Sequence, residues 1–213
     1  MICDHCRASN QVGALFCSQC GLAFSQKSPG GAGGATLHGE RRQITVLFCD
    51  IVESTKLAAM LDPEEYHDII RAFARCCTDV VASFEGHVSE MRGDGALVIF
   101  GYPTSRGDEA ERAIRAALTI IAAVPRLVLP NNVRLQVRVG IATGLAAIDA
   151  SSSKEPAFAG DALNLAARLQ SLAEPSTVVI SSLAKRLAGG FFDLVDLGET
   201  TSRASPIRCR PGA

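Results

Sequence analysis

Residues 41–55 read RRQITVLFCDIVEST and join a strand pattern to a helix pattern. Residues 43–49 form an apolar, partly β-branched run of the length expected for a buried strand. Asp50 follows this run directly, and a short helix is expected at residues 54–61. The segment therefore predicts a buried strand that ends at a carboxylate and then turns into a helix.

The residues that follow predict a sheet covered by helices. Asp62, Pro63 and Glu65 occupy the N-cap, first-turn and capping-box positions of a helix that is expected to run to about residue 84. The other expected elements are hairpin strands at residues 87–91 and 96–100, a helix from about residue 108 to residue 124, a strand pair at residues 135–141 and 145–148, a helix at residues 161–173 and a strand at residues 177–180. This order predicts an α+β fold with a ferredoxin-like βαββαβ core, in which helices pack on one face of a mostly antiparallel sheet.

Composition predicts one full domain and a small appendage. The chain has 213 residues, of which 47% are hydrophobic and 20% are charged, so it can bury a core and is not disordered as a whole. The formal net charge of -1 excludes a polybasic surface and argues against nucleic acid as a partner. No apolar run approaches the ~20 residues of a membrane span, and residues 1–6 show no secretory signal. We therefore expect no membrane span and a cytoplasmic location.

Four cysteines near the N-terminus have the spacing of a zinc site. They form two C-x2-C pairs separated by ten residues, Cys3 with Cys6 and Cys17 with Cys20. Each pair can present two thiolates from one tight turn to a tetrahedral ion. So short a segment cannot build a core without a metal or a disulfide, and a reducing compartment disfavours disulfides. Residues 1–24 are therefore predicted to be a zinc ribbon with one structural Zn2+, and redox or disulfide pairs are the alternative.

The ribbon is expected to be separate from the main domain. Residues 25–39 read SQKSPGGAGGATLHG and contain almost nothing that can be buried, which predicts a flexible Gly-rich linker before a main domain at residues 40–210. Between Cys3 and Cys20 the ribbon has one basic residue, Arg7, and one aromatic residue, Phe16. These are too few for a surface that binds phosphates and stacks bases, so we expect a protein partner or an effect on a dimer instead.

Two carboxylates stand at the ends of predicted strands. Asp50 follows the first strand, and Asp94 lies at the tip of the hairpin in a Gly-Asp-Gly turn. Each alone is equally typical of a cap or a turn. Neighbouring strands can nevertheless place both side chains at one divalent cation, and Mg2+ is commonly held by one or two carboxylates plus substrate phosphates. The helix start at Ser54 and Thr55 adds backbone N–H groups that can hold phosphate oxygens.

A third polar feature lies in the helix expected at residues 161–173. Asn164 and Arg168 are four residues apart, so they share one face of that helix. In isolation, such a pair is more often a solvated helix surface than a functional site. The pair gains meaning only together with the two carboxylates.

Four collinear segments resemble the catalytic domain of class III nucleotide cyclases, of the bacterial adenylate/guanylate cyclase type. They are RRQITVLFCDIVEST at residues 41–55, GHV through GDG to FGYP at residues 86–103, VRVGIATG at residues 137–144 and GDALNLAARL at residues 160–169. Four ordered motifs over most of residues 40–198 are far more specific than any one of them. The chain thus resembles a cyclase catalytic domain preceded by a zinc ribbon.

The resemblance implies that ATP or GTP is converted to its 3',5'-cyclic monophosphate and pyrophosphate for intracellular signalling. It implies that Asp50, Asp94 and the carbonyl of Ile51 bind two Mg2+ or Mn2+ ions. One ion would activate the ribose 3'-hydroxyl and the other would hold the triphosphate. Ser54 and Thr55 would contact the substrate at the helix start.

The resemblance also assigns roles to Asn164 and Arg168. Asn164 would position the ribose, and Arg168 would meet the charge that develops on the α-phosphate. In the family, the metal pair and this Asn/Arg pair come from different subunits of a head-to-tail dimer. Because this chain carries both halves, the resemblance implies a homodimer with two equivalent sites.

Three positions concern the nucleotide itself. Glu90 lies four residues before the second metal carboxylate, where adenylate cyclases of this family have lysine and guanylate cyclases have glutamate. A carboxylate accepts the two donors of guanine, which favours GTP, but Glu90 can equally pair with Arg92 on the same strand face. Ala157 stands at the second base-reading position and reads nothing by its side chain, so ATP stays possible. Arg203 falls where a triphosphate-binding lysine is expected.

These departures support an alternative from another functional class. The loop at residues 149–156 is polar and has no glycine, and the tail after residue 198 lacks the familiar Leu-Lys-Gly. A degenerate cyclase-fold domain that acts as a regulatory or dimerisation module would show such changes. The four retained residues of the metal and transition-state pairs favour the enzyme.

Overall fold

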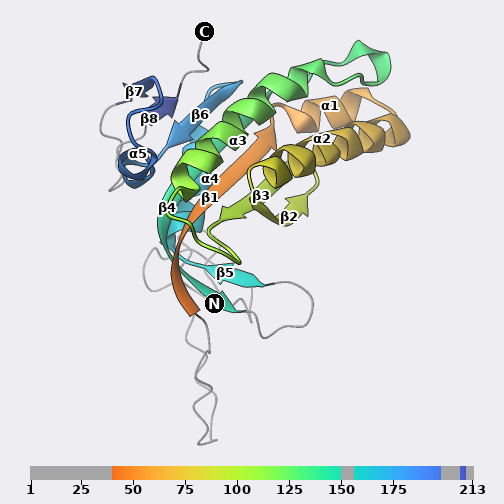
Figure 1. Cartoon of the computed structure of the whole chain (residues 1–213). Helices are drawn as coiled ribbons and strands as arrows, with labels where there is room; N and C mark the ends of the chain where they lie inside the picture. Colours follow the sequence, from red (N-terminus) through yellow and green to blue (C-terminus); the bar gives the residue numbers. More distant parts are fainter. Residues whose placement is uncertain (1–39, 150–155, 198–206, 210–213) are drawn as a thin grey trace, which may run out of the picture. The chain divides into compact units, whose positions relative to one another are not determined.

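The computed structural model describes residues 40–149, 156–197 and 207–209. The predicted ribbon at residues 1–24, the linker and Arg203 lie outside these described residues. The described elements are β1 (Glu40–Ile51), α1 (Ser54–Met60), α2 (Pro63–Ser83), β2 (His87–Arg92), β3 (Gly95–Phe100), α3 (Glu109–Ala123), the short 3-10 helices η1 (Val124–Arg126) and η2 (Pro130–Asn132), β4 (Val137–Asp149), β5 (Ala157–Ala159), α4 (Asp161–Leu172), β6 (Thr177–Ile180), α5 (Ser182–Ala188), β7 (Leu194–Asp196) and β8 (Ile207–Cys209) (Figure 1).

The strands form one sheet with β1 near its centre. The strand order is β2-β3-β1-β4-β6-β8-β7, and β5 pairs with the end of β4. The long pair of β1 and β4 is antiparallel and runs from Glu40 opposite Ile148 to Ile51 opposite Val137. The described pairs are antiparallel with one exception, the parallel pair of β4 and β6. The predicted mostly antiparallel sheet is therefore present.

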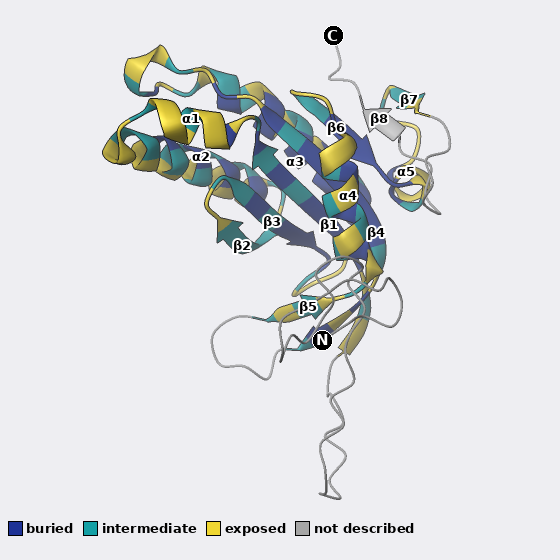
Figure 2. Ribbon diagram, turned by 180° about the vertical axis from the view of Figure 1, so that it is seen from behind, coloured by how far each residue is buried: buried dark blue, intermediate teal, exposed yellow. Residues whose placement is uncertain are grey.

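Helices cover both faces of this sheet, so the predicted one-sided arrangement is wrong. Helices α2 and α3 pack on one face, and α4 lies on the opposite face (Figures 1 and 2). The reason is visible in β1, whose residues are buried on both sides. Leu47 and Cys49 belong to the core under α2 and α3, whereas Ile44 and Val46 belong to the core under α4. A strand that is apolar on both faces needs cover on both.

Strand β4 differs from its prediction, because the expected pair of strands is one continuous strand of 13 residues. Gly144, which lies between the two predicted strands, is opposite Ile44 within the ladder. A Cβ there would come within 3.2 Å of the Cβ of Ala162, so this glycine provides close approach to α4 instead of a turn. The short strand β5 beside β4 was not predicted.

Most helix boundaries agree with the sequence prediction to within two residues. The predicted capping box of α2, however, does not form. Asp62 stands at the N-cap of α2, but its side chain makes no capping hydrogen bond. Glu65 instead accepts hydrogen bonds from Nδ2 of Asn131 at 3.1 Å. Among the described helices, none is both long and apolar enough to cross a membrane.

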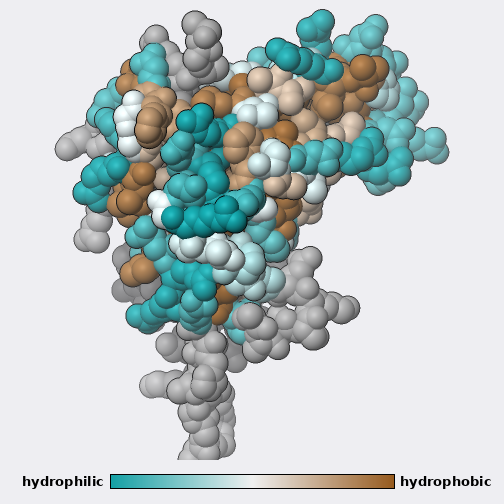
Figure 3. Space-filling model, in the orientation of Figure 1, coloured by the Kyte–Doolittle hydropathy of each residue, from teal (hydrophilic) through white to brown (hydrophobic). Residues whose placement is uncertain are grey.

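The face that carries α3 is mostly hydrophilic at its middle. Figure 3 shows hydrophobic residues exposed nearer its ends, around the turn after α3 and around α5 and β7. Val128, after α3, and Phe191, after α5, are 99% and 74% exposed. Neither residue lines the main cavity, which lies on the α4 side of the sheet.

Candidate active site

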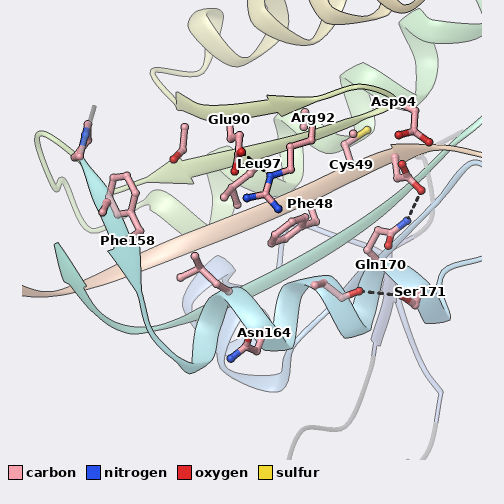
Figure 4. Close-up of a pocket in the computed structure, with 18 residues that line it drawn as sticks. Phe48, Cys49, Glu90, Arg92, Asp94, Leu97, Phe158, Asn164, Gln170 and Ser171 are labelled. Carbon is pink, nitrogen blue, oxygen red and sulfur yellow. Dashed lines mark hydrogen bonds and ion pairs between the residues drawn. The ribbon is translucent and has the colours of Figure 1, made fainter. Parts of the chain in front are cut away.

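A cavity of about 810 Å³ lies between the β2-β3-β1 part of the sheet and α4 (Figure 4). Polar and apolar side chains share its walls. The polar residues are Asp50, Ser89, Glu90, Arg92, Asp94, Asn164, Gln170 and Ser171, and the larger apolar residues are Phe48, Leu97, Phe158 and Leu163. This mixture suits a ligand with both a charged part and a flat apolar part.

The two predicted metal carboxylates meet at this cavity. Asp50 lies opposite Gly95 in the β1-β3 ladder, and the backbone N–H of Ile51 donates to the carbonyl of Asp94 at 3.0 Å. Strand alternation puts Asp50 on the α4 side of β1, together with Phe48. The pairing of β1 with β3 therefore brings Asp94, from the β2-β3 turn, beside Asp50 as the sequence predicts.

The electrostatics of this corner are those of two carboxylates held together. Burial and the negative charge of Asp94 raise the pKa of Asp50, while Arg138 and Gln170 act in the opposite direction. Burial and the charges of Asp94 and Asp50 also raise the pKa of Tyr66 on α2. Like charges sharing a partly buried site are destabilising unless a cation lies between them. The corner therefore has the electrostatic character of a cation site.

Three neighbours of the carboxylates were missed by the sequence analysis. Arg138 lies directly opposite Asp50 in the β1-β4 ladder, with its Nη2 3.6 Å from Oδ2 of Asp50. Nε2 of Gln170 donates to the same oxygen at 3.3 Å. Tyr66 is the third. Nε of Arg138 is buried and has no hydrogen-bond partner among the described residues, so this guanidinium keeps an unused donor beside the site.

The start of α1 supports the same corner. Glu53 has a left-handed backbone with φ of 56°, and α1 begins at the next residue. The hydroxyl of Ser54 donates to Oδ2 of Asp94 and so helps to hold that carboxylate in place. Thr55, the other residue expected to contact the substrate here, is exposed.

Asn164 and Arg168 do not meet the carboxylates within one chain. In Figure 4 the side chain of Asn164 points away from Asp94 and from the strands. Arg168 is exposed, does not line the cavity, and donates from Nε to the carbonyl of Asn164 at 3.4 Å. The pair therefore lies on one exposed helix face as predicted, and of the two only Asn164 borders the cavity.

The predicted base-reading positions also line the cavity. Glu90 and Arg92 form an ion pair, with Oε1 of Glu90 2.5 Å from Nε of Arg92, as the same-face alternative predicts. Ala157 on β5 is exposed at the cavity rim. Among the described residues, no group of three or more His, Cys, Asp or Glu side chains is arranged so that it could hold a metal ion by itself. Two carboxylates and a backbone carbonyl would therefore leave the other metal positions to substrate and water, as is usual for Mg2+.

Comparison with known proteins identifies a family. Residues 38–208 match the family model described as the adenylate and guanylate cyclase catalytic domain. The chain is 37% identical over 177 residues to the uncharacterized protein R02095 of Rhizobium meliloti strain 1021, covering 81% of this chain and 17% of that protein. It is 28% identical over 165 residues to the human guanylate cyclase soluble subunit beta-2, covering 76% of this chain and 27% of that subunit. The chain thus spans less than a third of these curated relatives.

Solved structures agree with this match. The guanylyl cyclase Cya2 is 28% identical with a TM-score of 0.71, and the alignment covers 80% of this chain and 91% of that one. The guanylate cyclase domain of RhGC from Catenaria anguillulae, solved with GTP, is 20% identical with a TM-score of 0.75, and the alignment covers 80% of this chain and 98% of that one. The second likeness shows the fold alone, a curled antiparallel sheet with helices. On the match over residues 38–208, the chain belongs to the adenylate and guanylate cyclase catalytic domain family.

Proposed function

We propose that the chain is a nucleotide cyclase that converts a purine nucleoside triphosphate to its 3',5'-cyclic monophosphate and pyrophosphate. The observation that carries the proposal is the convergence of Asp50 and Asp94 at a cavity whose other walls are formed by Phe48, Leu97 and Phe158. Carboxylates suit the metal-bound triphosphate, and apolar side chains suit the flat purine. Family membership supports the same reaction class.

Asp50, Asp94 and the carbonyl of Ile51 would hold Mg2+ or Mn2+. Two such ions, when bound, promote loss of the ribose 3'-hydroxyl proton and neutralise charge on the triphosphate. Ser54 keeps Asp94 oriented through its hydroxyl. Arg138, whose Nη2 lies 3.6 Å from Oδ2 of Asp50, would balance the charge of that carboxylate from outside the cavity lining.

Asn164 and Arg168 complete the site only in a second subunit. Because both side chains are exposed and Arg168 lies outside the cavity of its own chain, the proposal requires a homodimer in which each cavity receives this pair from the partner. Asn164 would orient the ribose there. Arg168 would stabilise the charge that develops on the α-phosphate as pyrophosphate leaves.

The test is product formation by the full chain with Mn2+ or Mg2+, offered ATP and GTP separately. We expect a cyclic nucleotide from at least one substrate, and we expect Asp94→Ala to lower turnover by about 10²-fold or more because it removes a metal ligand. The matched control is Asp68→Ala, which removes an exposed carboxylate of α2 outside the cavity.

A folded, dimeric sample that forms no product from either nucleotide would contradict the cyclase. It would favour the degenerate regulatory module instead. The exposed methyl of Ala157 at the cavity rim is the observation that keeps this second candidate open, because that position offers no side-chain donor or acceptor to a base.

A further inference from the structure

Strand β2 presents a carboxylate and a guanidinium side by side to the cavity. Oε1 of Glu90 lies 2.5 Å from Nε of Arg92, and the two side chains are 40% and 80% exposed. Arg92 is the one basic residue among the described residues that line the cavity. In Figure 4 its side chain extends beside Leu97 and Phe48, over the apolar floor.

A β-bulge turns this pair toward the cavity. Val88 lies opposite Val98 but Glu90 lies opposite Leu97, so Ser89 is an extra residue in β2. Val88 and Met91 both pack on the core under α2 and α3, although they are three residues apart. Without the extra residue, alternation would put Glu90 on the face of Val88. The bulge therefore re-aims Glu90, and with it Arg92, into the cavity.

The terminal groups of Arg92 remain available. The ion pair uses Nε, and the structure gives the two terminal nitrogens of Arg92 no other partner among the described residues. An ion pair this exposed contributes little to stability, so the side chain can reorient when a ligand enters. Ala157, across the cavity, cannot compete for the base edge.

The order of donors and acceptors on this pair matches one purine. Guanine presents, along one edge, the donors N2–H and N1–H followed by the acceptors O6 and N7, whereas adenine presents an acceptor, a donor and an acceptor. A carboxylate beside a guanidinium presents acceptors followed by donors. The guanine edge therefore pairs with both side chains. Adenine instead places its N1 acceptor against the carboxylate and its amine donor against the guanidinium, so neither side chain is paired.

We propose that Arg92 is a specificity-determining residue, which together with Glu90 reads the guanine edge of GTP and replaces the base contact that Ala157 cannot make. The proposal rests on the proposed function and names the substrate of that site. Glu90 accepts from N1–H and N2–H of guanine, and Arg92 donates to O6 and N7. A site built to hydrogen-bond one substrate rejects most strongly an analogue that leaves the site's polar groups unpaired. ATP is therefore disfavoured because it leaves Glu90 and Arg92 unpaired, and not because of its size.

The ion pair between Glu90 and Arg92 also allows a role for Arg92 that would contradict the proposal. If Arg92 only neutralises Glu90, it competes with guanine for the carboxylate, and its removal strengthens selection for GTP. The two roles therefore predict changes of opposite sign in one ratio.

The experiment compares the full chain with Arg92→Met and the matched control Arg71→Met. Arg71 pairs with Asp68 at 2.8 Å on α2, outside the cavity. Values of kcat/KM are measured for GTP, ATP and 7-deaza-GTP, which lacks the N7 acceptor. We expect Arg92→Met to lower the GTP to ATP ratio roughly 5- to 150-fold, the discrimination of one bidentate base contact, and to abolish discrimination against 7-deaza-GTP. An unchanged or raised ratio overturns the proposal.

Binding separates this proposal from the cyclase itself. 3'-Deoxy-GTP and 3'-deoxy-ATP lack the attacking hydroxyl, so their affinities for the wild-type chain and the variants are measured without turnover. Guanine preference that is lost in Arg92→Met supports the role of Arg92 even if no product is ever formed. Turnover with no guanine preference in the wild-type chain overturns the role of Arg92 and leaves the cyclase standing.

Discussion

Two acidic residues of this domain occupy opposite electrostatic environments. Asp50 faces a second carboxylate, and burial together with that charge raises its pKa. Glu109, at the start of α3, is also buried, which opposes ionisation, but backbone N–H groups of Arg106 and Gly107 and the hydroxyl of Ser105 bind its carboxylate and lower its pKa. The first environment favours a bound cation, and the second holds a loop in place.

Glu109→Gln is expected to destabilise the domain by roughly 1–3 kcal/mol at pH 7, because several hydrogen bonds to a charged acceptor are weakened. Since the pKa is lowered in the folded state, this stabilisation is fully present above the ordinary glutamate pKa of 4.5 and is lost as the pH falls through the lowered value. Urea unfolding of the two proteins at pH 7 and pH 3 measures the difference.

The control for this change is Glu111→Gln, which alters a glutamate of the same helix that pairs with Arg115 at 2.8 Å. It should cost far less, because i,i+4 pairs at a surface contribute little. A gap between wild type and Glu109→Gln that persists undiminished at pH 3 would contradict the assigned cause.

At this scale the sequence predicted the carboxylates but not their neighbours. Asp50 and Asp94 stand at strand ends, where local pattern is informative, and they meet as expected. Arg138, Gln170 and Tyr66 reach the same corner only through strand register and helix packing. No local signal marks them, because the register that sets Arg138 opposite Asp50 depends on the whole β1-β4 ladder. The catalytic roles of the carboxylates stay predictions.

Among the described elements, α4 packs closest on its neighbour, strand β4. A Cβ at Gly140 would lie 2.2 Å from the carbonyl oxygen of Ala166 and 2.2 Å from the backbone nitrogen of Gln170. The α4 backbone therefore rests directly on β4 at this point. This close approach puts Gln170 within hydrogen-bond distance of Asp50.

Gly140→Ala is expected to destabilise the domain by about 3 kcal/mol or more, because neither backbone can move aside without disturbing the sheet. Gly190→Ala is the matched control, since a Cβ there meets nothing within 4 Å. Denaturant midpoints of the two variants provide the comparison. Similar midpoints would show that α4 can shift freely on β4.

Local patterns predicted elements well where periodicity was clear and poorly where packing overrode it. The strand of residues 43–49, the helix after Asp62 and the hairpin were readable from their own residues. The bulge at Ser89, the continuity of β4 through Gly144 and the position of α4 on the far face were not. In each of these cases a contact distant in sequence decides the conformation.

For the whole molecule, the proposed homodimer requires sites shared between two subunits, because Arg168 lies outside the cavity of its own chain. Asp50→Ala and Arg168→Ala chains should each be inactive alone. Mixed in equal amounts, they should recover about a quarter of wild-type activity, because half of the dimers are mixed and each mixed dimer has one intact site of two. Activity of the mixture against each parent is the measurement.

Mixing Asp50→Ala with Asp94→Ala supplies the control. Both lesions lie in the metal half of the site, so every dimer keeps two damaged sites and no recovery is expected. No recovery in the first mixture despite subunit exchange would place the complete site within one chain. Recovery in the control mixture would instead mean that Asp50 and Asp94 act in different subunits.

The two-faced burial of β1 has a consequence for how this chain tolerates change in length. Residues 44, 46, 48 and 50 share the cavity side, and residues 45, 47, 49 and 51 share the side of α2 and α3. Removal of one residue before Asp50 would exchange these sets and drive a charged carboxylate into an apolar core. A substitution in β1 therefore changes the environment of one side chain only. Deletion of a single residue would instead exchange the two faces of the strand and remove the whole site.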